Sequence, residues 1–133
     1  MKRFIVLLFF SVLVFTGCSY DRGIILFNRE PITSENVFKD SKTFPSGSRV
    51  YYLFIAPKKM HNEFIRVQVF NITDKDSWGG SNVLRTKDYR LMKDERYYYT
   101  DYFTLYEKGR YAIQVFSHED FQHPLAVNDF FIE

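Results

Sequence analysis

The sequence predicts an all-β sandwich of about seven short strands in two packed sheets. Three observations indicate this fold class. From Arg49 onward, short runs of β-branched and aromatic residues alternate with turn residues at intervals of about 8–14 positions. No long amphipathic helical pattern occurs after residue 23. Residues 18–133 hold eleven Phe and ten Tyr, and such side chains can each bury about 150–250 Å² in a core.

The first predicted strand is the short apolar run at residues 24–28. Residues 31–48 are mostly polar and contain two prolines, which predicts a long connection with one helical turn near residues 34–38. The run RVYYLFIA at residues 49–56 is apolar or aromatic after its first residue. Such a run is typical of a central strand, and Pro57 ends it.

Residues 63–72 alternate in polarity and predict the next strand. The composition DKDSWGGS at residues 74–81 predicts a turn, and a weak edge strand is expected around residues 83–86. One face of the 63–72 strand carries Ile65, Val67 and Val69, and the other carries Phe64, Arg66, Gln68 and Phe70.

The run RYYYTDYFTL at residues 96–105 predicts a strand, because residues with high β-propensity occupy nearly every position. Its alternation places Tyr98 and Tyr102 on the outer side. Residues 110–117 and 124–132 predict the last two strands. The side chains expected to face inward from these three strands are Tyr97, Tyr99, Phe103, Leu105, Tyr111, Ile113, Val115, Phe130 and Ile132.

A tyrosine follows a glycine-containing corner between two of these strands. One strand ends at Leu105, Gly109 lies in the corner, and Tyr111 opens the next alternating run. This pattern resembles the tyrosine corner of immunoglobulin-like sandwiches, in which the hydroxyl bonds back to the corner backbone. The resemblance implies an Ig-like β-sandwich, although Ile113 stands where antibody domains have a half-cystine. The alternative is an ordinary hairpin with a core tyrosine.

The first eighteen residues have the pattern of a secretory signal. Two cations precede residues 4–15, in which only Ser11 is polar, and the sequence FTGC then ends at Cys18, the only cysteine. The apolar run is too short for a bilayer span of ~20 residues. FTGC resembles the lipobox of bacterial lipoproteins, in the relaxed form that spirochaetes tolerate, with Phe15 in place of Leu, Val or Ile. The alternatives are an uncleaved anchor and an ordinary signal with an incidental cysteine.

The lipoprotein resemblance implies cleavage before Cys18 and acylation of its thiol. We therefore expect a signal peptide at residues 1–17, the lipidated cysteine with a short tether at residues 18–23, and one domain at residues 24–133. Several acyl chains on one cysteine anchor a protein stably, so a location on a bacterial membrane outside the cytoplasm is expected. Ser19 follows the cysteine where an inner-membrane retention signal would have Asp, which by analogy favours an outer membrane if the cell has one.

The predicted processing changes the charge balance. The whole chain has 18 basic and 16 acidic residues, and removal of residues 1–17 leaves 16 of each. A neutral domain lacks the positive field that drives sequence-independent nucleic-acid binding, so no nucleic-acid partner is expected. With Cys18 acylated, no thiol remains for a disulfide, a metal site or a nucleophile.

No pattern of catalytic or metal-binding residues is convincing. Asp74 and Asp76 resemble the start of a calcium loop, but Trp78 and Arg85 occupy positions where that loop needs ligands. No nucleophile elbow or phosphate loop occurs. We therefore expect no enzyme activity, metal or cofactor. One cluster of possible ligands has a spacing that matches no zinc motif: His118, Glu119, Asp120 and His123.

Exposed aromatic residues are the remaining functional signal. Tyr98 and Tyr102 on the outer side of their strand, and Trp78 in its turn, are candidate binding residues, because Tyr and Trp dominate protein interfaces and sugar-stacking sites. Tyr52 and Tyr111 fit the core better. The sequence thus predicts a membrane-anchored, non-catalytic interaction or assembly module of the cell envelope, with a protein partner. Two alternatives stay open: a carbohydrate- or peptidoglycan-binding module, and an envelope enzyme or enzyme inhibitor that uses the turn before the last strand.

Overall fold

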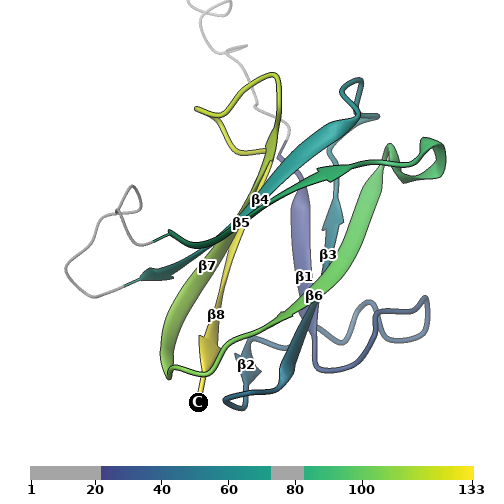
Figure 1. Ribbon diagram of the computed structural model, residues 1–133. Helices are drawn as coiled ribbons and strands as arrows, with labels where there is room; N and C mark the ends of the chain where they lie inside the picture. The colour runs from purple at the N-terminus through teal and green to yellow at the C-terminus, as the bar shows by residue number, and fades with distance from the viewer. Residues whose placement is uncertain (1–21, 73–82) are drawn as a thin grey trace, which may run out of the picture.

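The computed structural model describes residues 22–72 and 83–133, which form two packed β-sheets (Figure 1). One sheet has three strands in the order β1-β3-β6, and the other has five in the order β2-β8-β7-β4-β5. Neighbouring strands are antiparallel except β2 and β8, which are parallel. The elements in the described ranges are β1 (Ile24–Asn28), β2 (Thr43–Phe44), β3 (Arg49–Ile55), β4 (Phe64–Ile72), β5 (Val83–Arg90), the short 3-10 helix η1 (Lys93–Glu95), β6 (Tyr98–Thr104), β7 (Gly109–Ser117) and β8 (Ala126–Ile132).

The predicted all-β sandwich is confirmed, with a strand at each of the seven predicted places. β5 is longer than expected and forms an edge of the five-stranded sheet. The connection at residues 31–48 contains the expected turn at 34–38 and also an eighth strand, β2. The sequence did not predict β2, because this strand depends on parallel pairing with the distant strand β8.

The alternating faces of the strands are placed as predicted, with one exception. Tyr99 and Phe103 are buried on the inner side of β6. Tyr97 was expected beside them, but β6 begins only at Tyr98 and the side chain of Tyr97 is 56% exposed. The inward prediction failed there because alternation holds only within the paired part of a strand. The remaining buried side chains include Tyr52, Ile65, Val67, Val69, Tyr111, Ile113, Val115, Phe130 and Ile132.

The corner between β6 and β7 has the geometry that its sequence predicts. The hydroxyl of Tyr111 donates a hydrogen bond to the backbone carbonyl of Glu107 at 2.6 Å. Gly109 takes a φ of 152°, which favours glycine over residues with a side chain. β6 and β7 belong to different sheets, so the corner is a crossing between sheets and the hairpin alternative is wrong.

An ion pair joins the two sheets where β5 lies against β6. Nζ of Lys87 on β5 is 2.6 Å from Oδ2 of Asp101 on β6, and the hydroxyl of Tyr99 donates to the same oxygen at 3.0 Å. The rings of Tyr89 and Tyr99 stack beside this pair with centroids 4.2 Å apart. Burial raises the pKa of Asp101, but the hydrogen bonds from Lys87, the Tyr102 amide and Tyr99 outweigh it, so the net pKa is lowered.

We expect the Asp101 carboxylate to make stability depend on pH. Its pKa is lower in the folded than in the unfolded chain, so its contribution is present above the unfolded value of about 3.9 and is lost as the pH falls through the folded value. Asp101→Asn should lower the free energy of unfolding by about 1 kcal/mol at neutral pH, a modest figure because Lys87 is partly exposed. Urea titrations at pH 7 and at acid pH check this. Glu35→Gln, on an exposed turn, is the control. If Asp101→Asn lowers the free energy of unfolding by as much at acid pH as at pH 7, the expectation is contradicted.

Candidate functional site

The outer face of the three-stranded sheet carries an unusual number of apolar and aromatic side chains. The strand register aligns them in rows across β1, β3 and β6, because residues in register share a face. The opposite face of the same sheet packs into the core. The three rows are Ile24–Ile55–Tyr98, Leu26–Leu53–Thr100 and Asn28–Tyr51–Tyr102.

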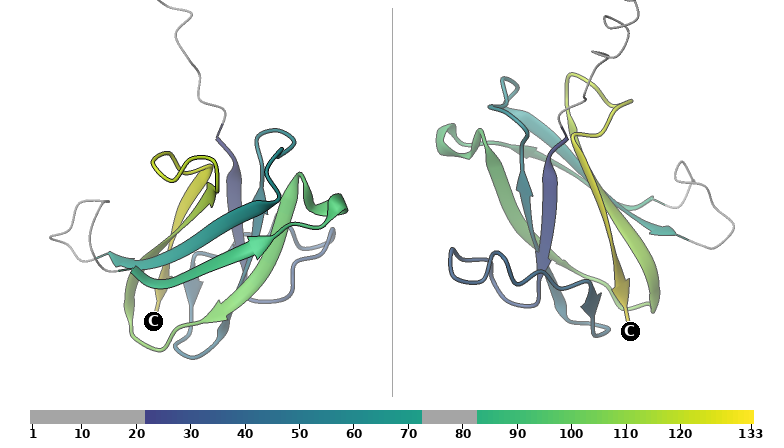
Figure 2. Two further views of the ribbon diagram at one scale, coloured as in Figure 1. Left: turned by 45° about the horizontal axis from the view of Figure 1, so that its top comes forward. Right: turned by 180° about the vertical axis from the view of Figure 1, so that it is seen from behind.

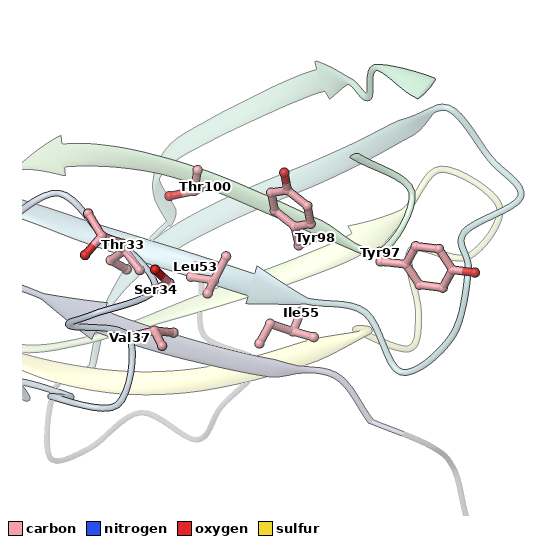
Figure 3. Close-up of a pocket in the computed structure, with 9 residues that line it drawn as sticks. Thr33, Ser34, Val37, Leu53, Ile55, Tyr97, Tyr98 and Thr100 are labelled. Atoms are coloured by element: carbon pink, nitrogen blue, oxygen red, sulfur yellow. The ribbon is translucent and has the colours of Figure 1, made fainter. Parts of the chain in front are cut away.

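A groove of about 530 Å³ lies on this face, within the volume range of about 300–1,000 Å³ that small-molecule sites occupy. Leu53 and Ile55 of β3 form its floor, and Tyr98 stands at one side (Figure 3). Ile32 and Val37 line the other side from the connection that follows β1. Among the described residues, none of those that line the groove is charged. The remaining lining residues are Thr33, Ser34, Tyr97 and Thr100.

Polar side chains hold the connection in place beside the sheet. Asn28 at the end of β1 donates from its side chain to the backbone carbonyls of Asn36 at 3.2 Å and Lys39 at 3.3 Å. Oδ1 of Asp40 accepts a hydrogen bond from the backbone amide of Phe27 at 2.8 Å. Figure 2 shows the connection on the side of β1 and β3 that faces away from the five-stranded sheet. The wall of the groove is therefore fixed by hydrogen bonds.

The hydroxyl of Thr100 makes the groove less polar than its composition indicates. Its Oγ1 donates to the backbone carbonyl of Tyr52 at 2.9 Å, which leaves no free hydroxyl proton for a ligand. A bound group at the floor therefore meets mostly methyl groups and aromatic carbon. The arrangement suits a neutral, apolar group.

The two predicted binding tyrosines both lie on this face, at opposite ends of β6. Tyr98 is 43% exposed and lines the groove, and Tyr102 is 44% exposed. The Tyr102 ring lies 5.4 Å from that of Tyr51, and the guanidinium of Arg49 lies over it at 4.7 Å from the centroid. Tyr102 thus belongs to an exposed aromatic and cationic cluster, which we call the tyrosine pair (Tyr51 and Tyr102 with Arg49).

The possible ligands in the turn between β7 and β8 do not converge. Nε2 of His118 lies 3.0 Å from Oδ1 of Asp88 on β5, whereas Nδ1 of His123 lies 2.9 Å from Oδ2 of Asp120. Arg66 donates to both carboxylate oxygens of Asp88, and this hydrogen bonding lowers the pKa of Asp88. Across the described ranges, no three His, Cys, Asp or Glu side chains gather closely enough to hold a metal ion.

Several predicted residues lie outside the described residues. They are Cys18, Trp78, and the calcium-loop positions Asp74 and Asp76 in the turn at 74–81. Within residues 22–72 and 83–133, no helix is long and apolar enough to cross a bilayer.

Comparisons with solved structures bear on the fold. The soluble domain of PmoD from Methylocystis sp. (Rockwell) matches with a TM-score of 0.52 and 11% identity, over 87% of this chain and 94% of that one. An immunoglobulin-like protein from Pseudomonas aeruginosa matches with a TM-score of 0.48 and 11% identity, over 83% of this chain and 92% of that one. A β-glucosidase from Kluyveromyces marxianus, in complex with glucose, matches with a TM-score of 0.39 and 14% identity. This match covers 88% of this chain and 14% of that one. The chain matches no protein-family model and no curated protein.

The strand order decides the fold class. β1, β3 and β6 occupy the places of strands A, B and E in one sheet, and β8, β7, β4 and β5 occupy those of G, F, C and C′ in the other. The fold is an immunoglobulin-like β-sandwich. In an Ig-like sandwich a D strand would pair with the free edge of E, and the described residues hold no strand at that place. The Ig-like framework thus leaves the face of A, B and E narrow and open beside the connection.

The sequence predicted the outward position of Tyr98 and Tyr102 but not the groove that Tyr98 lines. A signal was present in the run at residues 49–56, because a strand that is apolar on both faces needs cover on both. Tyr51, Leu53 and Ile55 are the outward members of that run. Ile32 and Val37 carried no local signal, because their position depends on hydrogen bonds from Asn28.

Proposed function

We propose that the protein is a lipid-anchored, non-catalytic interaction module of a bacterial cell envelope. In this proposal acylated Cys18 holds the chain at the membrane, and the Ig-like sandwich binds a protein partner through the outer face of β1, β3 and β6. The observation that carries it is the open apolar groove with the tyrosine pair on one face. The leader sequence supports the anchor, and the fold is compatible with an interaction role.

The two parts of the face have complementary properties for binding a protein. The groove is uncharged and accepts an apolar side chain of the partner. The tyrosine pair presents Tyr and Arg, the residue types in which interface hot spots are enriched. Tyr102 follows Tyr98 by four positions along β6, a distance of about 13 Å at the usual rise of a strand. One extended segment of a partner can therefore contact both parts.

Crosslinking in cells, followed by purification of the lipidated protein and mass spectrometry, tests this function. We expect a reproducible partner with the natural chain. The double variant Tyr98→Ser and Tyr102→Ser should weaken the isolated complex about 30-fold or more, which corresponds to the loss of a hot spot of about 2 kcal/mol. Both side chains are exposed, so the variant should keep its far-UV circular dichroism spectrum.

Tyr106→Ser is the matched control, because Tyr106 is 74% exposed and lies beyond the far end of β6. It should retain the partner. Recovery of the protein alone, or equal binding by the double variant, would contradict the proposal. A glycan array probed with the same variants examines the carbohydrate alternative, which requires glycan binding that the double variant loses.

A further inference from the structure

One end of the sandwich gathers several chain segments around the point where the tether enters. β1 and β6 begin at this end, and β3 ends there (Figure 1). The backbone amide of Gly23 donates to the carbonyl of Leu125 at 2.7 Å, which fixes the entry point. The backbone amide of Ala56 donates to the carbonyl of Tyr97 at 2.7 Å, and the backbone amide of Met60 donates to the carbonyl of Arg96 at 2.9 Å. These bonds join the β3–β4 turn to the segment before β6.

The surface at this end combines lysines with exposed apolar and aromatic side chains. Lys58 and Lys59 are exposed in the β3–β4 turn, which contains no acidic residue from position 57 to 62. Met92 and Tyr97 are 65% and 56% exposed on either side of η1, and Lys93 is exposed in it. Two acidic residues lie in η1. The Glu95 carboxylate accepts hydrogen bonds from the Met92 amide and the Tyr89 hydroxyl, and Asp94 is exposed. We call Lys58, Lys59, Met92, Lys93 and Tyr97 the interfacial patch.

Tyr97 lies where this patch meets the groove, because it also lines the groove. In Figure 3 its ring extends beyond the end of the sheet, while Tyr98 stands above the outer face. Tyr97 therefore lies at the end of the three-stranded sheet, beside the β3–β4 turn. A ligand that contacts the interfacial patch leaves most of the outer face open to a partner.

The length of the tether restricts what can lie against this end. Gly23 follows Cys18 by five positions, so a fully extended tether spans at most about 17 Å. If Cys18 carries the lipid, the interfacial patch cannot move far from the bilayer surface. The far end of the sandwich, with Tyr106, points the opposite way because β6 runs from one end to the other.

We propose that the interfacial patch rests on the membrane, in contact with the lipid headgroups; this inference depends on the lipid anchor of the proposed function. Tyr97 and Met92 lie at the headgroup level, where tyrosine is enriched in membrane proteins. Lys58, Lys59 and Lys93 face the lipid phosphates, because cationic side chains near an anionic surface are attracted to it. With this contact, the plane of the outer face of β1, β3 and β6 lies parallel to the membrane normal, so the groove opens to the side and not toward the bilayer.

Fluorescence of the lipidated full-length chain in vesicles tests the orientation. Trp78→Phe removes the only tryptophan, and Tyr97→Trp or the control Tyr106→Trp then reports on one end of the domain. The vesicles contain phosphatidylcholine and phosphatidylglycerol in equal parts, with or without brominated acyl chains. We expect the emission maximum of the Tyr97→Trp protein to shift to the blue and most of its emission to be quenched by the brominated lipid. The emission of the Tyr106→Trp protein should remain unchanged.

Charge reversal examines the role of the lysines. Lys58→Glu with Lys59→Glu should reduce the quenching of the Tyr97→Trp protein on these vesicles, while the protein still floats with them. A protein that floats but shows no quenching at 97, or equal quenching at 97 and 106, overturns the orientation and leaves the anchor intact. If the protein lacks the added mass of a lipid on Cys18 and fails to float with the vesicles, the anchor is overturned. The orientation, which depends on the anchor, is then overturned as well.

Discussion

Phe130→Ala is expected to lower the free energy of unfolding by about 3–5 kcal/mol, the usual cost of truncating a buried phenylalanine. Phe130 on β8 is fully buried. Its ring centroid lies 5.0 Å from that of Phe27, 5.5 Å from Phe103, 5.7 Å from Tyr111 and 6.1 Å from Phe44. These four rings come from both sheets and cannot all collapse into the space that alanine would leave.

Urea unfolding followed by circular dichroism measures this loss. Phe131→Ala is the matched control, because the neighbouring side chain points to the other face of β8 and is 45% exposed. It should change stability by less than about 1 kcal/mol. Since single domains are stable by about 5–15 kcal/mol, Phe130→Ala should leave a marginally folded protein. Similar losses for the two variants would show that the aromatic cluster is not the centre of the core.

The central position of Phe130 was predictable in part from the sequence. Alternation along residues 124–132 and 110–117 placed Phe130 and Tyr111 on inward faces, and both are buried. The pattern worked there because one face of an antiparallel strand is covered and the other is less so. It failed at Tyr97, which precedes the paired part of β6.

The features that were missed depend on contacts between distant parts of the chain. β2 consists of two residues that pair with the end of β8, so its local sequence contains no strand pattern. The ion pair of Lys87 and Asp101 crosses from one sheet to the other, and strand alternation carries no information about which residues meet across sheets. Local periodicity therefore predicts which face a side chain occupies, but not its partners.

The candidate site divides in the same way. The outward direction of Tyr98 and Tyr102 follows from alternation within a single strand. The groove beside Tyr98 requires that the connection after β1 fold back over the sheet, which Asn28 and Asp40 bring about through bonds to backbone groups 8 to 13 positions away. Alternation could thus predict that Tyr98 and Tyr102 are exposed, but not the groove that Tyr98 lines.

Tyr111→Phe is expected to lower the free energy of unfolding by about 1–3 kcal/mol, because it deletes a buried donor and leaves a backbone carbonyl without its partner. The change keeps the ring, which stacks on Phe130 with an interplanar angle of 16°. The packing in the core is thus unaltered, and the loss measures the hydrogen bond to Glu107 alone. Thermal and urea unfolding of the natural chain and the variant give the value.

Tyr106→Phe separates the corner from a general effect of removing a tyrosine hydroxyl. Tyr106 lies five residues before Tyr111 in the same corner and is 74% exposed, so its hydroxyl can bond to water before and after folding. The control should shift stability by less than about 0.5 kcal/mol. Equal unfolding midpoints for Tyr111→Phe and the natural chain would mean that water replaces the Tyr111 hydroxyl as the donor to the Glu107 carbonyl. The crossing from β6 to β7 would then be held by Gly109 and by core packing, and the tyrosine that identified the corner in the sequence would act through its ring.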